Sequence, residues 1–187
     1  MNNTLKKTTQ LGAFTALAVT MGYLFSVVPN VEMVTATIFI AGFIMGPWEG
    51  LAVGIVAEGL YSLFNPYGPA APPLFIAQVV SMAITGFVGG HFGKHRSGLT
   101  PWAPVYLALA GLGLSLLFAV LTTLSFMPLA GLSFHQLTGS FIYGIGFYLT
   151  HILSNTLIFL TVVPILIRVL SKVIPTLGVA SCVEETT

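Results

Sequence analysis

The chain has 187 residues, of which 56% are hydrophobic and only 6% are charged, and its mean hydropathy is +0.97. Soluble domains typically carry about 25% charged residues, so the composition argues against a water-soluble globular protein. All five acidic residues are Glu, which excludes Asp-dependent catalytic triads, and a net charge of +1 excludes the basic surface that nucleic-acid binding requires. The single cysteine, Cys182, excludes a disulfide framework and a cysteine-based metal cluster. The sequence therefore predicts an all-α integral membrane protein with a single membrane domain over residues 1–187.

Long apolar stretches follow one another along most of the chain. A transmembrane helix needs about 20 mainly apolar residues, and the stretch 31–64 is too long for one span, since it would measure roughly 51 Å as a helix. Its middle reads Gly46-Pro47-Trp48-Glu49-Gly50, a helix-breaking pair followed by an interfacial aromatic residue and a charge. We therefore expect two short spans there.

The basic residues test this division. They occur in three groups, Lys6 and Lys7, Lys94 and Arg96, and Arg168 and Lys172. The positive-inside rule places all three groups in the cytoplasm, which requires an even number of crossings between them. The number of crossings before Lys94 is even only when the stretch 31–64 forms two spans. We therefore expect a six-transmembrane-helix bundle with both termini cytoplasmic. The expected spans are 11–28, 33–46, 48–64, 74–92, 104–126 and 139–164, with a span ending or kinking near Pro164 and a polar C-terminal tail over 173–187.

Three external loops follow from this topology, at residues 29–32, 65–73 and 127–138, and none contains Lys or Arg. The loop 65–73 holds four prolines, which stiffen it. It is either the rim of a binding site or a tight connector between helices.

Polar residues within the expected spans are few, and each is costly in a membrane unless it is paired or faces a cavity. Glu58 lies near the outer end of the third span, and Gln78 lies in the outer part of the fourth. Tyr148, His151 and Asn155 share one face of the sixth span. Each group either forms interhelical hydrogen bonds, worth about 0.6–2 kcal/mol, or lines a ligand site.

The sequence gives little support for a catalytic site or a metal-binding site. His91 and His95 have the spacing of a helical metal site, but the glycines around them and the lack of a nearby carboxylate or thiolate argue against a metal. No nucleophile motif or phosphate-binding loop occurs. We expect neither an enzyme, nor a metal, nor a cofactor.

The first span carries two pairs of small residues, Gly12 with Ala16 and Ala18 with Gly22. Such pairs allow helices to approach closely within a bilayer. They serve either packing within the chain or docking to another membrane subunit.

Several local runs resemble those of the substrate-binding S components of energy-coupling factor (ECF) transporters, which take up vitamins in bacteria. These runs are Pro29-Asn30-Val31-Glu32 before an apolar helix and Gly46-Pro47-Trp48, Asn65-Pro66-Tyr67-Gly68, Ile76-Ala77-Gln78, and His151 to Asn155. Together they cover about residues 10–170.

The resemblance implies a six-helix, multi-pass protein of the bacterial cell membrane that binds a vitamin or precursor in an outward-facing pocket. It also implies association with a membrane coupling (T) subunit and two cytoplasmic ATPase subunits. Members of the family contact the coupling subunit through an Ala-x-x-x-Ala pattern on the first helix. Here the nearest equivalents are the pairs formed by Gly12, Ala16, Ala18 and Gly22.

The expected pocket is rich in aromatic and amide groups and suits a flat polar heterocycle that stacks on rings and accepts amide hydrogen bonds. Its expected residues are Asn30, Glu32, Glu58, Asn65, Tyr67, Gln78, Tyr148, His151 and Asn155. Because the external loops lack Lys and Arg, a phosphate ester is disfavoured. Among the substrates of the family, a pyrimidine-type vitamin precursor fits, and a corrinoid is the alternative.

Three alternative functions stay open at the level of the sequence. The first is a solitary carrier that uses an ion gradient through Glu58 and His151. The second is an intramembrane enzyme, and the third is an assembly subunit without a ligand.

Overall fold

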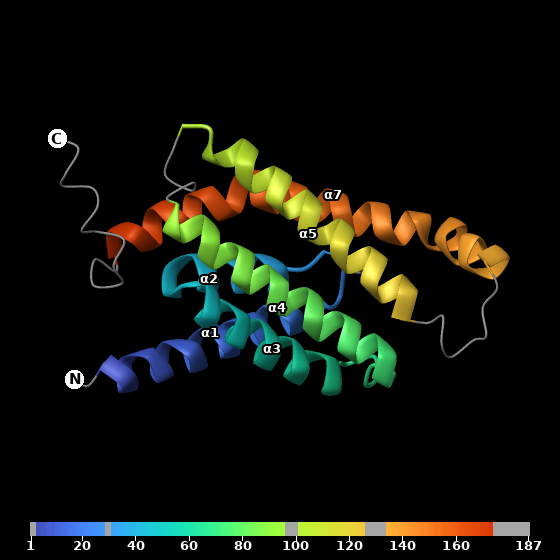
Figure 1. Ribbon diagram of the computed structural model, residues 1–187, viewed down its shortest axis with the longest axis horizontal. Coiled ribbons are helices and arrows are strands. Elements are labelled where there is room, and N and C mark those ends of the chain that lie inside the picture. Colours follow the sequence, from blue (N-terminus) through green and yellow to red (C-terminus); the bar gives the residue numbers. More distant parts are fainter. Residues whose placement is uncertain (1–2, 29–30, 96–100, 126–133, 174–187) are drawn as a thin grey trace.

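The computed structural model describes residues 3–28, 31–95, 101–125 and 134–173. Six helices and no strand form this part of the chain (Figure 1). In chain order they are α1 (Asn3–Phe25), α2 (Val34–Met45), α3 (Pro47–Leu63), α4 (Pro72–Lys94), α5 (Ala103–Ser125) and α7 (Phe134–Val173). The predicted all-α fold is therefore confirmed.

The apolar stretch 31–64 is divided in the structure at Gly46. This residue ends α2 with a φ of +116°, a backbone angle that only glycine adopts without strain, and its N–H donates to the carbonyl of Gly42 at 2.7 Å. Pro47 then occupies the first turn of α3, where its missing N–H costs no hydrogen bond. The chain thus reverses within two residues and leaves α2 only about 18 Å long.

Helices α1 and α3 run parallel, and α4 runs antiparallel to them. Near one end Lys7 forms an ion pair with Glu49 at 2.8 Å, and near the other end the Tyr23 hydroxyl donates to the carbonyl of Phe64. Ser62 lies beside Gln78 near the start of α4. These contacts fix the relative heights of the three helices.

Helices α5 and α7 form an antiparallel pair along one side of the bundle (Figure 1). Gly111 packs against the ring of Phe159, and Thr123 hydrogen-bonds Tyr148 further along the same interface. Lys6 and Lys7 lie near the start of α1, Lys94 is the last residue of α4 and Arg168 lies near the end of α7. These three helix ends lie toward the same end of the bundle (Figure 1). The opposite end is built from the C-terminal ends of α1 and α3 and the start of α4.

Helix α2 forms the core. Its residues from Val34 to Ile44 are all buried, and Phe39 packs edge-to-face against Phe92 of α4 and Phe159 of α7. A 12-residue helix that is apolar on every side is stable only when other helices surround it.

Glycines allow α2, α3 and α4 to touch through their backbones. A Cβ atom on Gly86 of α4 would collide with the backbone of Gly50 of α3, and one on Gly42 of α2 would collide with Gly86. The same holds where Gly54 meets Met82 and where Gly90 meets Pro47. No side chain therefore separates these three helices.

Three helical segments are long and apolar enough to cross a membrane: Pro72–Lys94, Ala103–Ser125 and Gly144–Leu170. The last of these contains Pro164, and α7 does not end there but continues to Val173. The expected polar tail lies outside the described residues, except for Val173.

Replacing Gly86 by alanine tests the glycine contacts. We expect Gly86→Ala to lower the free energy of unfolding by about 1–3 kcal/mol, because the added methyl group meets rigid backbone. Thermal unfolding in detergent measures the loss. Gly113→Ala is the matched control on α5, where a Cβ meets nothing within 4 Å. Equal melting temperatures for the two variants would contradict the packing described.

Candidate ligand-binding cavity

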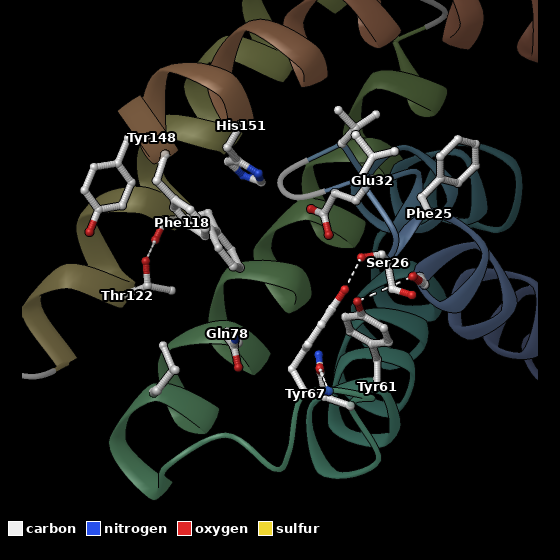
Figure 2. A pocket seen from close by; sticks show the side chains of 16 residues that line it. Phe25, Ser26, Glu32, Tyr61, Tyr67, Gln78, Phe118, Thr122, Tyr148 and His151 are labelled. Carbon is white, nitrogen blue, oxygen red and sulfur yellow. Dashed lines mark hydrogen bonds between the residues drawn. The ribbon is translucent and has the colours of Figure 1, made fainter. Parts of the chain in front are cut away.

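A cavity of about 570 Å³ lies toward the end of the bundle where α1 and α3 end and α4 begins. Figure 2 shows the side chains that line it. Its wall is formed by the C-terminal end of α1, residues 31 and 32, α3, the following loop, and parts of α4, α5 and α7. Segments far apart in the sequence therefore meet around one space. Its volume falls within the range of about 300–1,000 Å³ that is usual for pockets binding drug-sized molecules.

The wall of the cavity is rich in aromatic side chains. Six phenylalanines and tyrosines contribute to it: Phe25, Tyr61, Tyr67, Phe118, Phe147 and Tyr148. Glu32 is the one charged side chain among the described lining residues, and no Lys or Arg lies among them. Such a wall offers faces for stacking a flat ring and no cation for an anionic group.

The loop after α3 is fixed in place by hydrogen bonds. The Asn65 side chain accepts from the backbone N–H of Tyr67, and Gly68 completes the turn with a φ of +103°. The Tyr67 hydroxyl donates to the carbonyl of Ser26 at the end of α1, at 2.7 Å (Figure 2). Since Asn65 and Tyr67 also line the cavity, the loop is a rim held against α1 rather than a bare connector.

Gln78 of α4 connects the cavity to a buried acid. The Ser62 hydroxyl lies 3.0 Å from Gln78 Oε1 and 2.9 Å from Glu58 Oε1. Glu58 is 3% exposed and does not reach the cavity wall. Gln78 therefore stands between the buried carboxyl group and the cavity.

His151 of α7 carries an unsatisfied nitrogen at the cavity wall. Its side chain is 5% exposed, and its Nε2 atom has no hydrogen-bond partner among the described residues. The side-chain amide of Asn155 donates to the carbonyl of His151 at 3.2 Å and lies 3.4 Å from its Nδ1 atom. With Nδ1 facing an N–H donor, the proton of the neutral ring belongs on Nε2, which then offers a donor to a ligand.

Side chains of α5 contact the two polar side chains of α7 at the cavity wall, Tyr148 and His151. The Tyr148 hydroxyl hydrogen-bonds Thr123 of α5, and the ring of Phe118 lies 5.1 Å from the ring of His151, measured between centroids. Two side chains of α5 thus hold two side chains of α7 in place.

The structure brings most of the predicted site residues together. Six of the nine line the cavity: Glu32, Asn65, Tyr67, Gln78, Tyr148 and His151. Glu58 and Asn155 lie behind the wall: Ser62 connects Glu58 to the lining residue Gln78, and Asn155 bonds the lining residue His151 directly. Asn30 lies outside the described residues.

The polar residues that follow Gln78 on α4 do not line the cavity. Ser81 and Thr85 are buried, and their hydroxyls donate to carbonyls of their own helix, those of Ala77 and Ser81. Sequence reasoning also missed Phe25, Phe118 and Phe147, because an apolar ring in a membrane helix carries no signal that separates cavity from core. In α5, the one sequence feature that points to the cavity is the spacing of Phe118 and Thr122 at i and i+4, which places both on the same face of the helix.

The two small-residue pairs of α1 have different surroundings. Ala18 is fully buried, and Gly22 is buried against the ring of Tyr61. Gly12 and Ala16 are exposed, and a Cβ on Gly12 would meet nothing within 4 Å. One pair therefore packs within the chain, and the other is accessible.

No group of three or more His, Cys, Asp or Glu side chains able to hold a metal occurs in the described part of the chain. Long apolar helices around an aromatic cavity with a few polar groups are typical of a membrane protein that binds a small organic molecule. Residues 2–172 match the family described as ECF-type riboflavin transporter, S component, and the chain belongs to this family. It is thus a vitamin-binding subunit of a transporter and not an enzyme. No curated protein and no solved structure matches the chain.

Replacing Tyr67 by phenylalanine tests the fixed rim. Removing its hydroxyl deletes the bond to Ser26, worth about 1 kcal/mol, so amide hydrogen exchange in residues 65–70 should become about fivefold faster. Hydrogen exchange with mass spectrometry measures the change. The control is Tyr106→Phe, which removes a hydroxyl from an exposed tyrosine outside the cavity. Unchanged exchange in Tyr67→Phe would show that the bond does not hold the loop.

Proposed function

We propose that the chain binds riboflavin in the cavity between α1, α3, α4, α5 and α7. The observation that carries the proposal is an aromatic wall that also bears amide, imidazole and carboxyl groups but no cation. The flat isoalloxazine ring suits the aromatic faces, and its carbonyl and N–H groups suit Gln78 and His151. The family description, which names riboflavin, supports this ligand over the pyrimidine-type precursor that the sequence suggested.

We further propose that the helices cross the bacterial cell membrane six times. Successive helices alternate in direction, and the helix ends that carry the described basic residues lie toward one end of the bundle (Figure 1). The positive-inside rule places that end in the cytoplasm, together with the N-terminal end of α1. The cavity then opens toward the outside of the cell, as an importer requires.

Energy for transport has to come from elsewhere, because the chain has no phosphate-binding loop. We propose that it comes from a membrane coupling subunit and two cytoplasmic ATPases. The exposed pair formed by Gly12 and Ala16 gives the coupling subunit a face of α1 that it can approach closely.

Riboflavin binding can be measured directly. We expect flavin to co-purify with the protein in detergent, where mass spectrometry identifies it, and the fluorescence of added riboflavin to be quenched on binding. Gln78→Ala should weaken binding about tenfold, because it removes one hydrogen-bonding group from the wall. Gln10→Ala, at the other end of the bundle, is the matched control. Absence of both co-purified flavin and quenching would refute the proposed ligand.

Discrimination against flavin mononucleotide is a separate expectation. This compound adds a phosphate to riboflavin, and a phosphate placed in the cavity would lose its hydration without meeting a Lys or Arg side chain. Riboflavin should therefore bind at least about tenfold more tightly. Competition for bound riboflavin by each flavin measures the ratio, and equal affinities would contradict the description of the cavity.

A further inference from the structure

Ser62 sits between two oxygen atoms that cannot both receive its proton. Its hydroxyl lies 2.9 Å from Oε1 of Glu58 and 3.0 Å from Oε1 of Gln78. A serine hydroxyl has one proton to donate, whereas its oxygen can accept as well. One of these two contacts is therefore a bond in which Ser62 is the acceptor.

Two arrangements of protons satisfy all three side chains. In the first, Glu58 is a neutral acid that donates to Ser62, and Ser62 donates to Gln78 Oε1. In the second, Glu58 is ionised and accepts from Ser62, and the Gln78 amide is turned so that its Nε2 donates to Ser62. The first arrangement leaves Nε2 of Gln78 for the ligand, whereas the second leaves Oε1. The ligand thus meets an N–H donor in one case and an oxygen acceptor in the other.

Among the described residues, no cation stands near Glu58 to pair with an ionised form. Lys7 pairs with Glu49 near the start of α3, Lys94 is the last residue of α4 and Arg168 lies near the end of α7, whereas Glu58 lies near the end of α3. No described Lys or Arg is among the groups that act electrostatically on Glu58. A buried carboxylate without a cation is costly. The neutral acid is also the form that matches the observed placement of Gln78 Oε1 on Ser62.

Other titratable groups stand close enough to contribute to any dependence on pH. Tyr61 lies on α3 itself, Tyr23 of α1 packs edge-to-face against it, and Glu32 precedes α2. His151 of α7 faces the same cavity, and α4 contributes Gln78, which does not titrate. Glu32 differs from Glu58 because it lines the cavity and its Oε1 accepts from Thr35 at 2.8 Å.

We propose that Glu58 is a positioning residue which, as a neutral acid, fixes the Gln78 amide through Ser62 so that it donates a hydrogen bond to the ligand. The cavity then selects a ligand edge that carries an acceptor, such as a ring carbonyl. Loss of the proton from Glu58 reverses the amide and sets oxygen against oxygen. This inference rests on the proposed binding of riboflavin.

The test is the affinity for riboflavin as a function of pH, from mildly acidic to mildly alkaline conditions. The wild type should lose affinity about tenfold as the pH rises, as expected when one hydrogen bond becomes a repulsive contact. Glu58→Gln should keep the affinity of the acidic wild type at every pH, because its amide donates to Ser62 and does not titrate. Glu49→Gln, near the start of α3 and outside the cavity, is the matched control and should keep the wild-type dependence on pH.

A second measurement follows the proton itself. Calorimetric titration of the wild type with riboflavin, in buffers of different ionisation enthalpy at alkaline pH, should show proton uptake on binding. Ser62→Ala breaks the link and should abolish that uptake. Riboflavin binding with no pH dependence, or with a dependence that Glu32→Gln removes and Glu58→Gln keeps, would overturn this inference while leaving the proposed ligand intact. Failure of the wild type to bind riboflavin at any pH would overturn both.

Discussion

Backbone contact among α2, α3 and α4 is the constraint on which the rest of the structure depends. Gly42, Gly50 and Gly86 leave no room for side chains between these helices, so their relative heights are set by direct contact of main chains. In a bilayer, where apolar side chains gain little by leaving lipid, such close packing is a principal source of helix association. The contact also fixes Ser62 of α3 opposite Gln78 of α4.

The cavity lies where this tightly packed group meets the pair formed by α5 and α7. The packed group supplies the polar chain from Glu58 to Gln78 and the anchored rim, whereas the pair supplies Phe118, Tyr148 and His151. Each half holds its own polar groups by hydrogen bonds within that half. A ligand placed between them is therefore contacted by polar groups from both parts of the bundle.

The sequence predicts the helices more completely than the cavity. Gly46 and Pro47 mark a helix break by backbone chemistry alone, and the polar residues of the spans stand out against an apolar background. The position of a residue on a helix face does not show, however, whether the residue lines the cavity or lies behind its wall. Glu58 and Asn155 lie behind the wall because neighbouring helices cover them. Which residues are covered depends on how the helices pack against one another, and the sequence of one segment does not show this. Phe118 reaches the wall for the same reason, although its sequence context resembles that of any lipid-facing ring.

The anchored rim also bears on the thermodynamics of binding. Ordering a flexible loop costs conformational entropy, about 1–2 kcal/mol for each residue whose backbone is fixed. In this protein the turn at Asn65 and Gly68 and the bond from Tyr67 to Ser26 fix the loop by contacts made within the chain itself. Preorganisation of this kind leaves more of the interaction energy available as affinity. It suits a receptor that has to capture a scarce molecule from dilute solution.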